Sequence, residues 1–149
     1  IDNVQAPDVT NEVLPKLKEK WIDAGKVRLI LRDFPLDEPA LRAAMVVRCA
    51  RPERFYPLVE TLFETQDKWV VAKDVRAALE RIARLAGIAK KEFDACVADK
   101  ALEDQAAQSR LTAATRLGVD STPTFFINGK KFEGALSLDE LDKEIGPLL

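Results

Sequence analysis

The chain has two cysteines, Cys49 and Cys96, and thiol chemistry is the most specific chemistry that its residue types offer. The two cysteines do not have the Cys-x-x-Cys spacing that is typical of a redox-active dithiol. Two interpretations fit residues so far apart in the sequence. They are buried free thiols that act as small apolar side chains, or they form a structural disulfide that links two helices.

A catalytic role is not expected for either cysteine from its neighbours in the sequence. Arg48 and Arg51 flank Cys49, but adjacent positions on a helix do not face one another, so neither arginine is expected to contact the thiol. The chain has no histidine, which excludes Ser-His and Cys-His nucleophiles and most zinc sites. The sequence therefore indicates neither a metal site nor an organic cofactor.

Composition and charge exclude further classes of function. The net charge is −2, from 23 basic and 25 acidic residues, and no basic stripe carries interleaved aromatic residues, so nucleic-acid binding is not expected. No apolar run approaches the roughly 18 residues that a membrane span needs. The first residues do not have the pattern of a signal peptide, and a mature exported protein would look the same. A length of 149 residues suits one domain with a real core.

Residues 119–130 contain the strongest local structural signal in the chain. Pro123 lacks an N–H donor, so it must end one element or hold a special turn before the apolar run that follows it. Asn128-Gly129 separates this run from a second one, and Asn-Gly favours a type I′ hairpin turn because both residues accept positive φ. The pattern predicts a strand from Thr124, a tight turn, and a returning strand that reaches Phe132.

Helices are predicted for most of the remaining sequence. Apolar residues at helical spacing predict a first helix over 11–24, and a continuous apolar centre predicts a strand over Lys26–Arg32 that is buried on both faces. Ser137, with Glu140 three residues later, predicts a capping box at the start of the last helix. Between the first strand and the hairpin, helical periodicity predicts helices over 39–50, 53–66, 74–86, 90–98 and 101–117.

The Thr122-Pro123 loop, its hairpin and the final helix resemble the thioredoxin superfamily. More narrowly, residues 118–135 resemble the DsbA-like branch, the thiol-disulfide oxidoreductases. The order of the elements and shorter likenesses at 12–15, 26–36 and 41–44 support the same resemblance. It implies that the Thr122–Pro123 peptide bond is cis and that Thr122 and Pro123 bind the substrate backbone.

The resemblance also implies an architecture. The fold class is α/β, with a thioredoxin-like (DsbA-like) core formed by residues 1–38 and 118–149. A helical domain over 39–117 is inserted into this core. In the family, a central strand precedes the first helix, and a Cys-x-x-Cys lies at the N-terminus of that helix, where the helix dipole stabilises a thiolate.

This motif and the central strand are missing from the sequence. The matching positions are Asn3, Val4, Gln5 and Ala6, and none of them is a thiol, so no catalytic residue is identified. Residues 1–6 are also too short and too polar to replace a buried strand. Three explanations are open: the sequence is part of a longer chain, a partner chain supplies the strand, or the protein is a redox-inactive relative. We prefer the first, because the remaining sequence departs little from the family pattern.

The function that the resemblance implies is disulfide exchange with extended or unfolded polypeptides that carry cysteines. The family implies the bacterial periplasm or the cell exterior as the setting, together with a redox partner protein. In such a compartment the even number of cysteines favours a structural Cys49–Cys96 disulfide.

The alternative function is a redox-inactive module that binds extended peptides at the Thr122–Pro123 loop without chemistry. A third interpretation, an isomerase or a glutathione-conjugating relative, has no residue in its favour.

Overall fold

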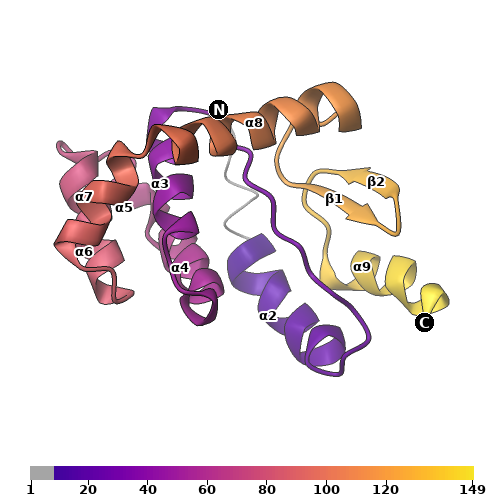
Figure 1. Cartoon of the computed structure of the whole chain (residues 1–149). Coiled ribbons are helices and arrows are strands. Elements are labelled where there is room, and N and C mark those ends of the chain that lie inside the picture. Colours follow the sequence, from indigo (N-terminus) through magenta and orange to yellow (C-terminus); the bar gives the residue numbers. More distant parts are fainter. Residues whose placement is uncertain (1–8) are drawn as a thin grey trace. The chain divides into compact units, whose positions relative to one another are not determined.

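The structure is a computed structural model, and it describes residues 9–149. Contacts within the chain divide it into two compact units. One unit consists of the described residues up to Leu31 together with Val119–Leu149, and the other consists of Arg32–Gly118. Figure 1 labels the elements of both units. That residues 39–117 are an insertion into a thioredoxin-like core stays a prediction.

The first unit begins with a helical segment that changes its turn at a proline. Val9–Val13 (η1) and Lys18–Ile22 (η2) follow the wider π-type turn, and Leu14–Leu17 (α2) between them is α-helical. Pro15 lies in the first turn of α2 and has no N–H to donate to the preceding turn, so a regular α-helical hydrogen bond is impossible there. The predicted first helix is therefore present, with an irregular hydrogen-bond pattern around its proline.

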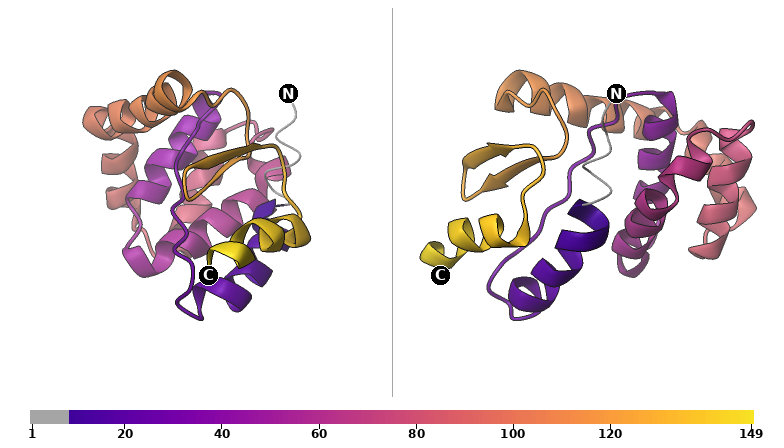
Figure 2. Two further views of the ribbon diagram at one scale, coloured as in Figure 1. Left: turned by 90° about the vertical axis from the view of Figure 1, so that its right-hand side faces the viewer. Right: turned by 180° about the vertical axis from the view of Figure 1, so that it is seen from behind.

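The predicted hairpin is confirmed. Thr124–Ile127 (β1) pairs antiparallel with Lys130–Glu133 (β2), and Ile127 is opposite Lys130 at the turn. Asn128 has φ = +46° and Gly129 has φ = +88°, the positive values that a two-residue hairpin turn of this kind requires. The hairpin lies beside the final helix in both views of Figure 2.

The final helix, Leu138–Ile145 (α9), starts with the predicted capping box. The Ser137 hydroxyl accepts a hydrogen bond from Glu140 N at 3.3 Å, and the Glu140 carboxylate accepts one from Ser137 N at 2.8 Å. The backbone N–H of Ser137 and its hydroxyl both donate to the Glu140 carboxylate, and these two bonds lower the pKa of that carboxyl. A short 3-10 turn, Gly146–Leu148, follows α9.

The core of the first unit joins the helical segment, the hairpin and α9. Its buried residues are Leu17, Leu141 and Ile145. Partly buried apolar side chains pack against them from the helical segment, from β1 and from the residues around α9: Val13, Leu14, Trp21, Val27, Phe125, Ile127, Leu136 and Leu138. Burial of these side chains is the main term that holds the three elements together.

The predicted strand Lys26–Arg32 is wrong. After Gly25, where φ = +69° ends the helical segment, these residues are extended but form no ladder with any described strand. Burial on both faces is also wrong, because Ile30 is 60% exposed. A strand exists through hydrogen bonds to a neighbour, and the apolar pattern of a segment does not supply that neighbour.

The second unit is helical, and all the helices predicted within it are present (Figure 1). A short additional helix, which the prediction does not contain, follows the second one. Three aspartates start helices by accepting a hydrogen bond from the backbone N–H three residues later, at 2.8 Å for Asp37, 2.9 Å for Asp74 and 3.1 Å for Asp99. The helices are α3 (Glu38–Arg48), α4 (Pro52–Glu64), α5 (Gln66–Trp69), α6 (Val75–Leu85), α7 (Lys90–Ala98) and α8 (Lys100–Leu117).

A disulfide between Cys49 and Cys96 crosses the core of the second unit. Cys49 follows the last residue of α3 and Cys96 lies in α7, with 6.3 Å between their Cα atoms. Several large side chains of the same unit are almost fully buried: Met45, Val46, Leu58, Leu79 and Phe93. None of the helices within residues 9–149 combines the length and the apolar character that crossing a membrane requires.

The segment Asp33–Leu36, which begins the second unit, is fastened to two of its helices. The Ser109 hydroxyl of α8 donates to the carbonyl of Asp33 at 2.9 Å, and the Arg110 guanidinium donates to the carbonyl of Pro35 at 3.0 Å. The Asp33 carboxylate also forms an ion pair with Arg48 of α3 at 2.6 Å. An irregular segment is thus held by side chains that satisfy its backbone groups.

Asp142 of α9 binds two side chains of η2 in the first unit. Its carboxylate accepts hydrogen bonds from Lys20 Nζ at 2.5 Å and from Trp21 Nε1 at 2.6 Å. These bonds lower the pKa of the Asp142 carboxyl below its usual value of 3.8, although partial burial opposes the shift. A group whose pKa is lower in the folded state stabilises the fold above its unfolded pKa and loses that effect as the pH falls.

We therefore expect Asp142→Asn to lower the free energy of unfolding by about 1.5–3 kcal/mol at pH 7, the range for hydrogen bonds to a charged group. The difference in free energy of unfolding between variant and wild type should shrink as the pH falls below 3.8. There the Asp142 carboxyl is protonated first in the unfolded chain and, at lower pH, in the folded chain as well. The measurement is urea unfolding across this pH range. Asp139→Asn, an exposed carboxyl of the same helix, is the control, and an equal, pH-independent loss in both variants would contradict the prediction.

Replacing Cys49 and Cys96 together by alanine is expected to lower the free energy of unfolding by about 4 kcal/mol in the chain-entropy model. The reason is that the disulfide closes a loop between residues 47 apart in the sequence and so restricts the unfolded chain. Urea unfolding of the full-length protein, monitored by far-ultraviolet circular dichroism, measures the effect. The reduced wild type should approach the double variant, and equal unfolding midpoints for all three samples would exclude a stabilising role.

Candidate functional site

The loop between α8 and β1 contains the residues that the sequence points to as a binding site. The Thr122–Pro123 peptide bond is cis. The carbonyl of Pro123 accepts a hydrogen bond from Gly134 N at 2.9 Å, and Thr124 Oγ1 donates to the carbonyl of Ser121 at 2.7 Å. The base of the hairpin and a local side-chain bond therefore fix the backbone on both sides of the Thr122–Pro123 bond.

The strand that follows this loop has two unequal faces. Phe125 and Ile127 pack against the core of the first unit, whereas Phe126 is 43% exposed. Within the described residues, β2 is the strand that pairs with β1, along one of its edges. Both Thr122 and Pro123 are half-buried, so the loop offers backbone and a partly covered surface at the start of an extended segment.

Cys49 and Cys96 belong to the other unit and form the disulfide described above. Cys96 is buried, with 4% of its surface exposed, and Cys49 is exposed. The structural role of this disulfide and the substrate-binding role of Thr122 and Pro123 remain proposals. The expected positions of the redox motif, Asn3 to Ala6, lie outside the described residues.

Metal and cofactor sites give no further candidate in the described part of the chain. No group of three or more histidine, cysteine, aspartate or glutamate side chains is placed there to hold a metal ion. The two features of residues 9–149 that bear on function are the Thr122–Pro123 loop and the Cys49–Cys96 disulfide.

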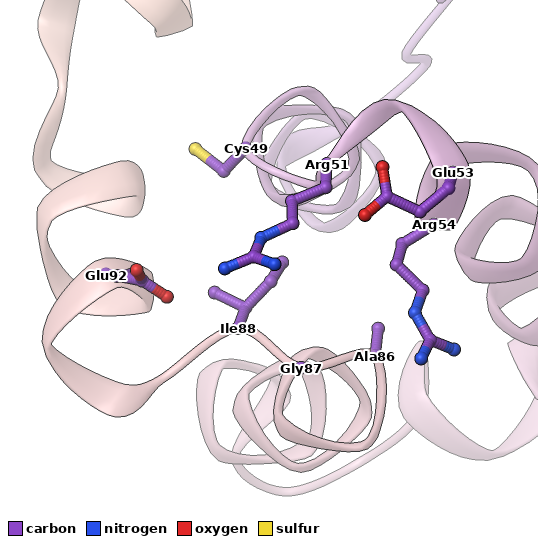
Figure 3. A pocket seen from close by; sticks show the side chains of 8 residues that line it. All are labelled: Cys49, Arg51, Glu53, Arg54, Ala86, Gly87, Ile88 and Glu92. Atoms are coloured by element: carbon purple, nitrogen blue, oxygen red, sulfur yellow. The ribbon is translucent and has the colours of Figure 1, made fainter.

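The sequence interpretation missed a cavity beside Cys49. It placed Cys49 inside a helix and expected Arg51 to face away from it, but α3 ends at Arg48 and a new helix starts at Pro52. This change of direction brings Arg51 and Arg54 to the same cavity as Cys49 (Figure 3). The sequence does predict a break between the helices over 39–50 and 53–66, but it gives no sign that the turn around Ile88 faces this break.

Comparison with known proteins gives one family. A family model described as thioredoxin matches residues 8–146. A Rickettsia typhi protein with the provisional name protein-disulfide oxidoreductase is 31% identical over 135 residues, which cover 89% of this chain and 49% of that protein. A Rickettsia prowazekii protein with the same provisional name is 31% identical over 139 residues, covering 92% of this chain and 50% of that protein. The chain spans about half the length of the curated relatives that it matches.

Solved structures agree with this result. The crystal structure of alpha-DsbA1 from Wolbachia pipientis matches with a TM-score of 0.85 at 32% identity, covering 96% of this chain and 80% of that one. A protein-disulfide isomerase from Novosphingobium aromaticivorans matches with a TM-score of 0.70 at 21% identity, covering 97% and 87%, and at this identity the match shows the fold alone.

These matches confirm the predicted fold class, a mostly helical α/β fold of the thioredoxin type. The family model extends over nearly all of the described residues, and the structural match includes both the helical unit and the unit with the hairpin. On these grounds the chain belongs to the thioredoxin superfamily and, within it, to the DsbA-like thiol-disulfide oxidoreductases.

Proposed function

We propose that this chain is the substrate-binding and helical part of a protein that exchanges disulfides with extended, cysteine-bearing polypeptides. The family membership supports this function. The observation that carries it in the chain itself is the Thr122–Pro123 loop, which is held at the start of β1 by the hydrogen bond from Gly134 N to the carbonyl of Pro123. Thr122 lies directly before this proline, and in this proposal its backbone contacts the substrate.

The proposed binding mode is the addition of a strand. An extended peptide forms main-chain hydrogen bonds with the backbone of Thr122, and the neighbouring apolar surface, including the exposed face of Phe126, covers its side chains. Main-chain recognition suits a protein that acts on many different polypeptides, since every residue has the same backbone groups. The partners in this proposal are unfolded or extended polypeptides with cysteines, together with a redox partner protein.

The redox-active cysteines in this proposal are not Cys49 and Cys96. These two are linked across the core of the helical unit, and Cys96 is 4% exposed, so an extended polypeptide cannot reach both sulfurs. We propose instead that a Cys-x-x-Cys pair precedes these residues in a longer chain. A substrate thiolate then attacks one sulfur of that pair, forms a mixed disulfide with it, and releases the other sulfur as a thiolate. The setting in this proposal is the bacterial periplasm or the cell exterior.

A redox-inactive binding module is the second candidate, because the chain has the proposed binding loop and lacks a Cys-x-x-Cys. A further version of the main proposal has a partner chain that supplies the missing strand. The two candidate functions differ in one respect that can be measured. Only the oxidoreductase has a second cysteine pair that exchanges its disulfide with a substrate.

The full-length protein is expected to have four cysteines that can be alkylated after reduction: Cys49, Cys96 and the proposed pair. Adding a reduced peptide with two cysteines should make the proposed pair available to alkylation within one reaction cycle and leave Cys49 and Cys96 protected. Alkylation followed by peptide mass mapping measures this. If Cys49 and Cys96 are the only cysteines and the peptide stays reduced, the binding-module function is correct instead.

Peptide binding is tested separately from the redox step by amide hydrogen exchange. An extended peptide without cysteines should slow the exchange of the Thr122 amide, because the bound backbone protects it. Exchange of the Gly134 amide should change little, since this amide already donates to the carbonyl of Pro123. Nuclear magnetic resonance resolves the two amides, and equal or absent changes at both would exclude this binding mode while leaving the redox result unaffected.

A further inference from the structure

A cavity of about 410 Å³ lies beside the exposed end of the Cys49–Cys96 disulfide. Three parts of the helical unit form it: the end of α3 with the start of α4, the turn between α6 and α7, and the first turn of α7 (Figure 3). Cys49 and Ile88 line it together with four charged side chains, those of Arg51, Glu53, Arg54 and Glu92. All of these residues belong to one unit, so the cavity is a feature of the helical unit itself.

The two sulfurs of the disulfide differ in their surroundings. Cys49 is exposed and borders the cavity, whereas Cys96 is 4% exposed and its Sγ lies 3.1 Å from the carbonyl oxygen of Met45. We infer from this difference that a nucleophile in the cavity attacks the sulfur of Cys49, with Cys96 as the leaving group. Once reduced, the Cys96 thiol has an acceptor within reach, because its S–H can donate to Met45.

Two arginines and two glutamates line the cavity, and the arginines are suited to bind a ligand with a carboxylate. Neither Arg51 nor Arg54 forms an ion pair with a described carboxylate, and both are exposed. In Figure 3 the guanidinium of Arg51 extends into the space between Cys49 and Ile88. Of the two acidic side chains, Glu92 accepts a hydrogen bond from Ala89 N at 2.9 Å and is thereby engaged at the start of α7. Arginine binds carboxylates through two parallel hydrogen bonds, which suits this position.

We propose that this cavity binds small thiols that carry a carboxylate and directs them to Cys49. The thiolate of the ligand forms a bond with Cys49 Sγ, the bond between the two protein sulfurs breaks, and its electron pair goes to Cys96 Sγ, which takes a proton from water. The products are a mixed disulfide at Cys49 and a thiol at Cys96, and the exchange consumes no further oxidant or reductant. This site is separate from the proposed peptide-binding loop and does not depend on it.

Glutathione and 2-mercaptoethanol are the probes, since the first has carboxylates and the second has none. With the oxidised full-length protein, an acid quench and alkylation in denaturant should yield glutathione on Cys49 and the alkylating label on Cys96. Peptide mass mapping identifies both positions. A glutathione adduct on Cys96 instead, or no opening of this disulfide by either thiol, would overturn the proposal.

The arginines are tested by Arg51→Gln with Arg54→Gln. We expect opening by glutathione to slow about tenfold, as for the loss of a charge-assisted hydrogen bond, and opening by 2-mercaptoethanol to be unchanged. The control is Arg81→Gln with Arg116→Gln, which removes the same charge from exposed arginines that do not line the cavity. The cavity has no specific role if disulfide opening by glutathione slows equally in the two double variants. The same holds if the cavity variant slows opening by glutathione and by 2-mercaptoethanol to the same extent.

Reversing the charge gives an independent test. Arg51→Glu with Arg54→Glu should accelerate opening by cysteamine, a thiol with an ammonium group, and slow opening by glutathione. Added salt should reduce both effects, because the groups are exposed. Since both side chains are exposed, the variants should retain the circular dichroism spectrum of the wild type. An unchanged preference between the two thiols in a folded variant would overturn the proposal.

Discussion

The backbone pairing of β1 is the constraint on which the unit with the hairpin depends. A strand presents N–H and C=O groups along both edges, and each group needs a partner when it is buried. Among the described residues, β2 provides these partners along one edge, from Thr124 opposite Glu133 to Ile127 opposite Lys130. A two-stranded hairpin is barely stable alone, so the helical segment and α9 must cover it, and they do so through the core around Leu17 and Leu141. The same pairing positions Pro123, because the hydrogen bond from Gly134 N lies at the base of the hairpin.

Most of the helices and the hairpin could be predicted from the sequence, because their signals are local. Asn128-Gly129 determines a turn through positive φ at two adjacent residues, and Ser137 with Glu140 determines a helix start through two reciprocal hydrogen bonds. Both signals act within a few residues, so no distant part of the chain can override them easily. Thr122 and Pro123 were proposed as site residues through the resemblance of this loop and hairpin to the thioredoxin superfamily, and their binding role stays a prediction.

The errors of prediction concern features that depend on distant residues. Lys26–Arg32 has the composition of a buried strand, yet without a described neighbour it forms no ladder, and Ile30 is exposed. The cavity beside Cys49 was missed because it depends on a change of direction between Arg48 and Pro52 and on a turn from elsewhere in the chain, around Ile88. Asn3 to Ala6, where the resemblance places the redox motif, contain no cysteine, and no Cys-x-x-Cys occurs elsewhere in the sequence.

The anchoring of Asp33–Leu36 to α8 has a consequence for chain entropy. Ser109 and Arg110 hold the point where the chain enters the helical unit, and the remaining part of α8, up to Leu117, leads to the point where it leaves. The seven residues Leu111–Leu117 span about 10 Å of helix and act as a stiff spacer. The helical unit therefore presents its two chain ends at a set separation once it is folded. The other unit is formed by two segments from opposite ends of the sequence. Once the helical unit is folded, joining these segments costs the loop-closure entropy of a short gap. It does not cost the larger entropy of closing a flexible loop of the whole intervening length.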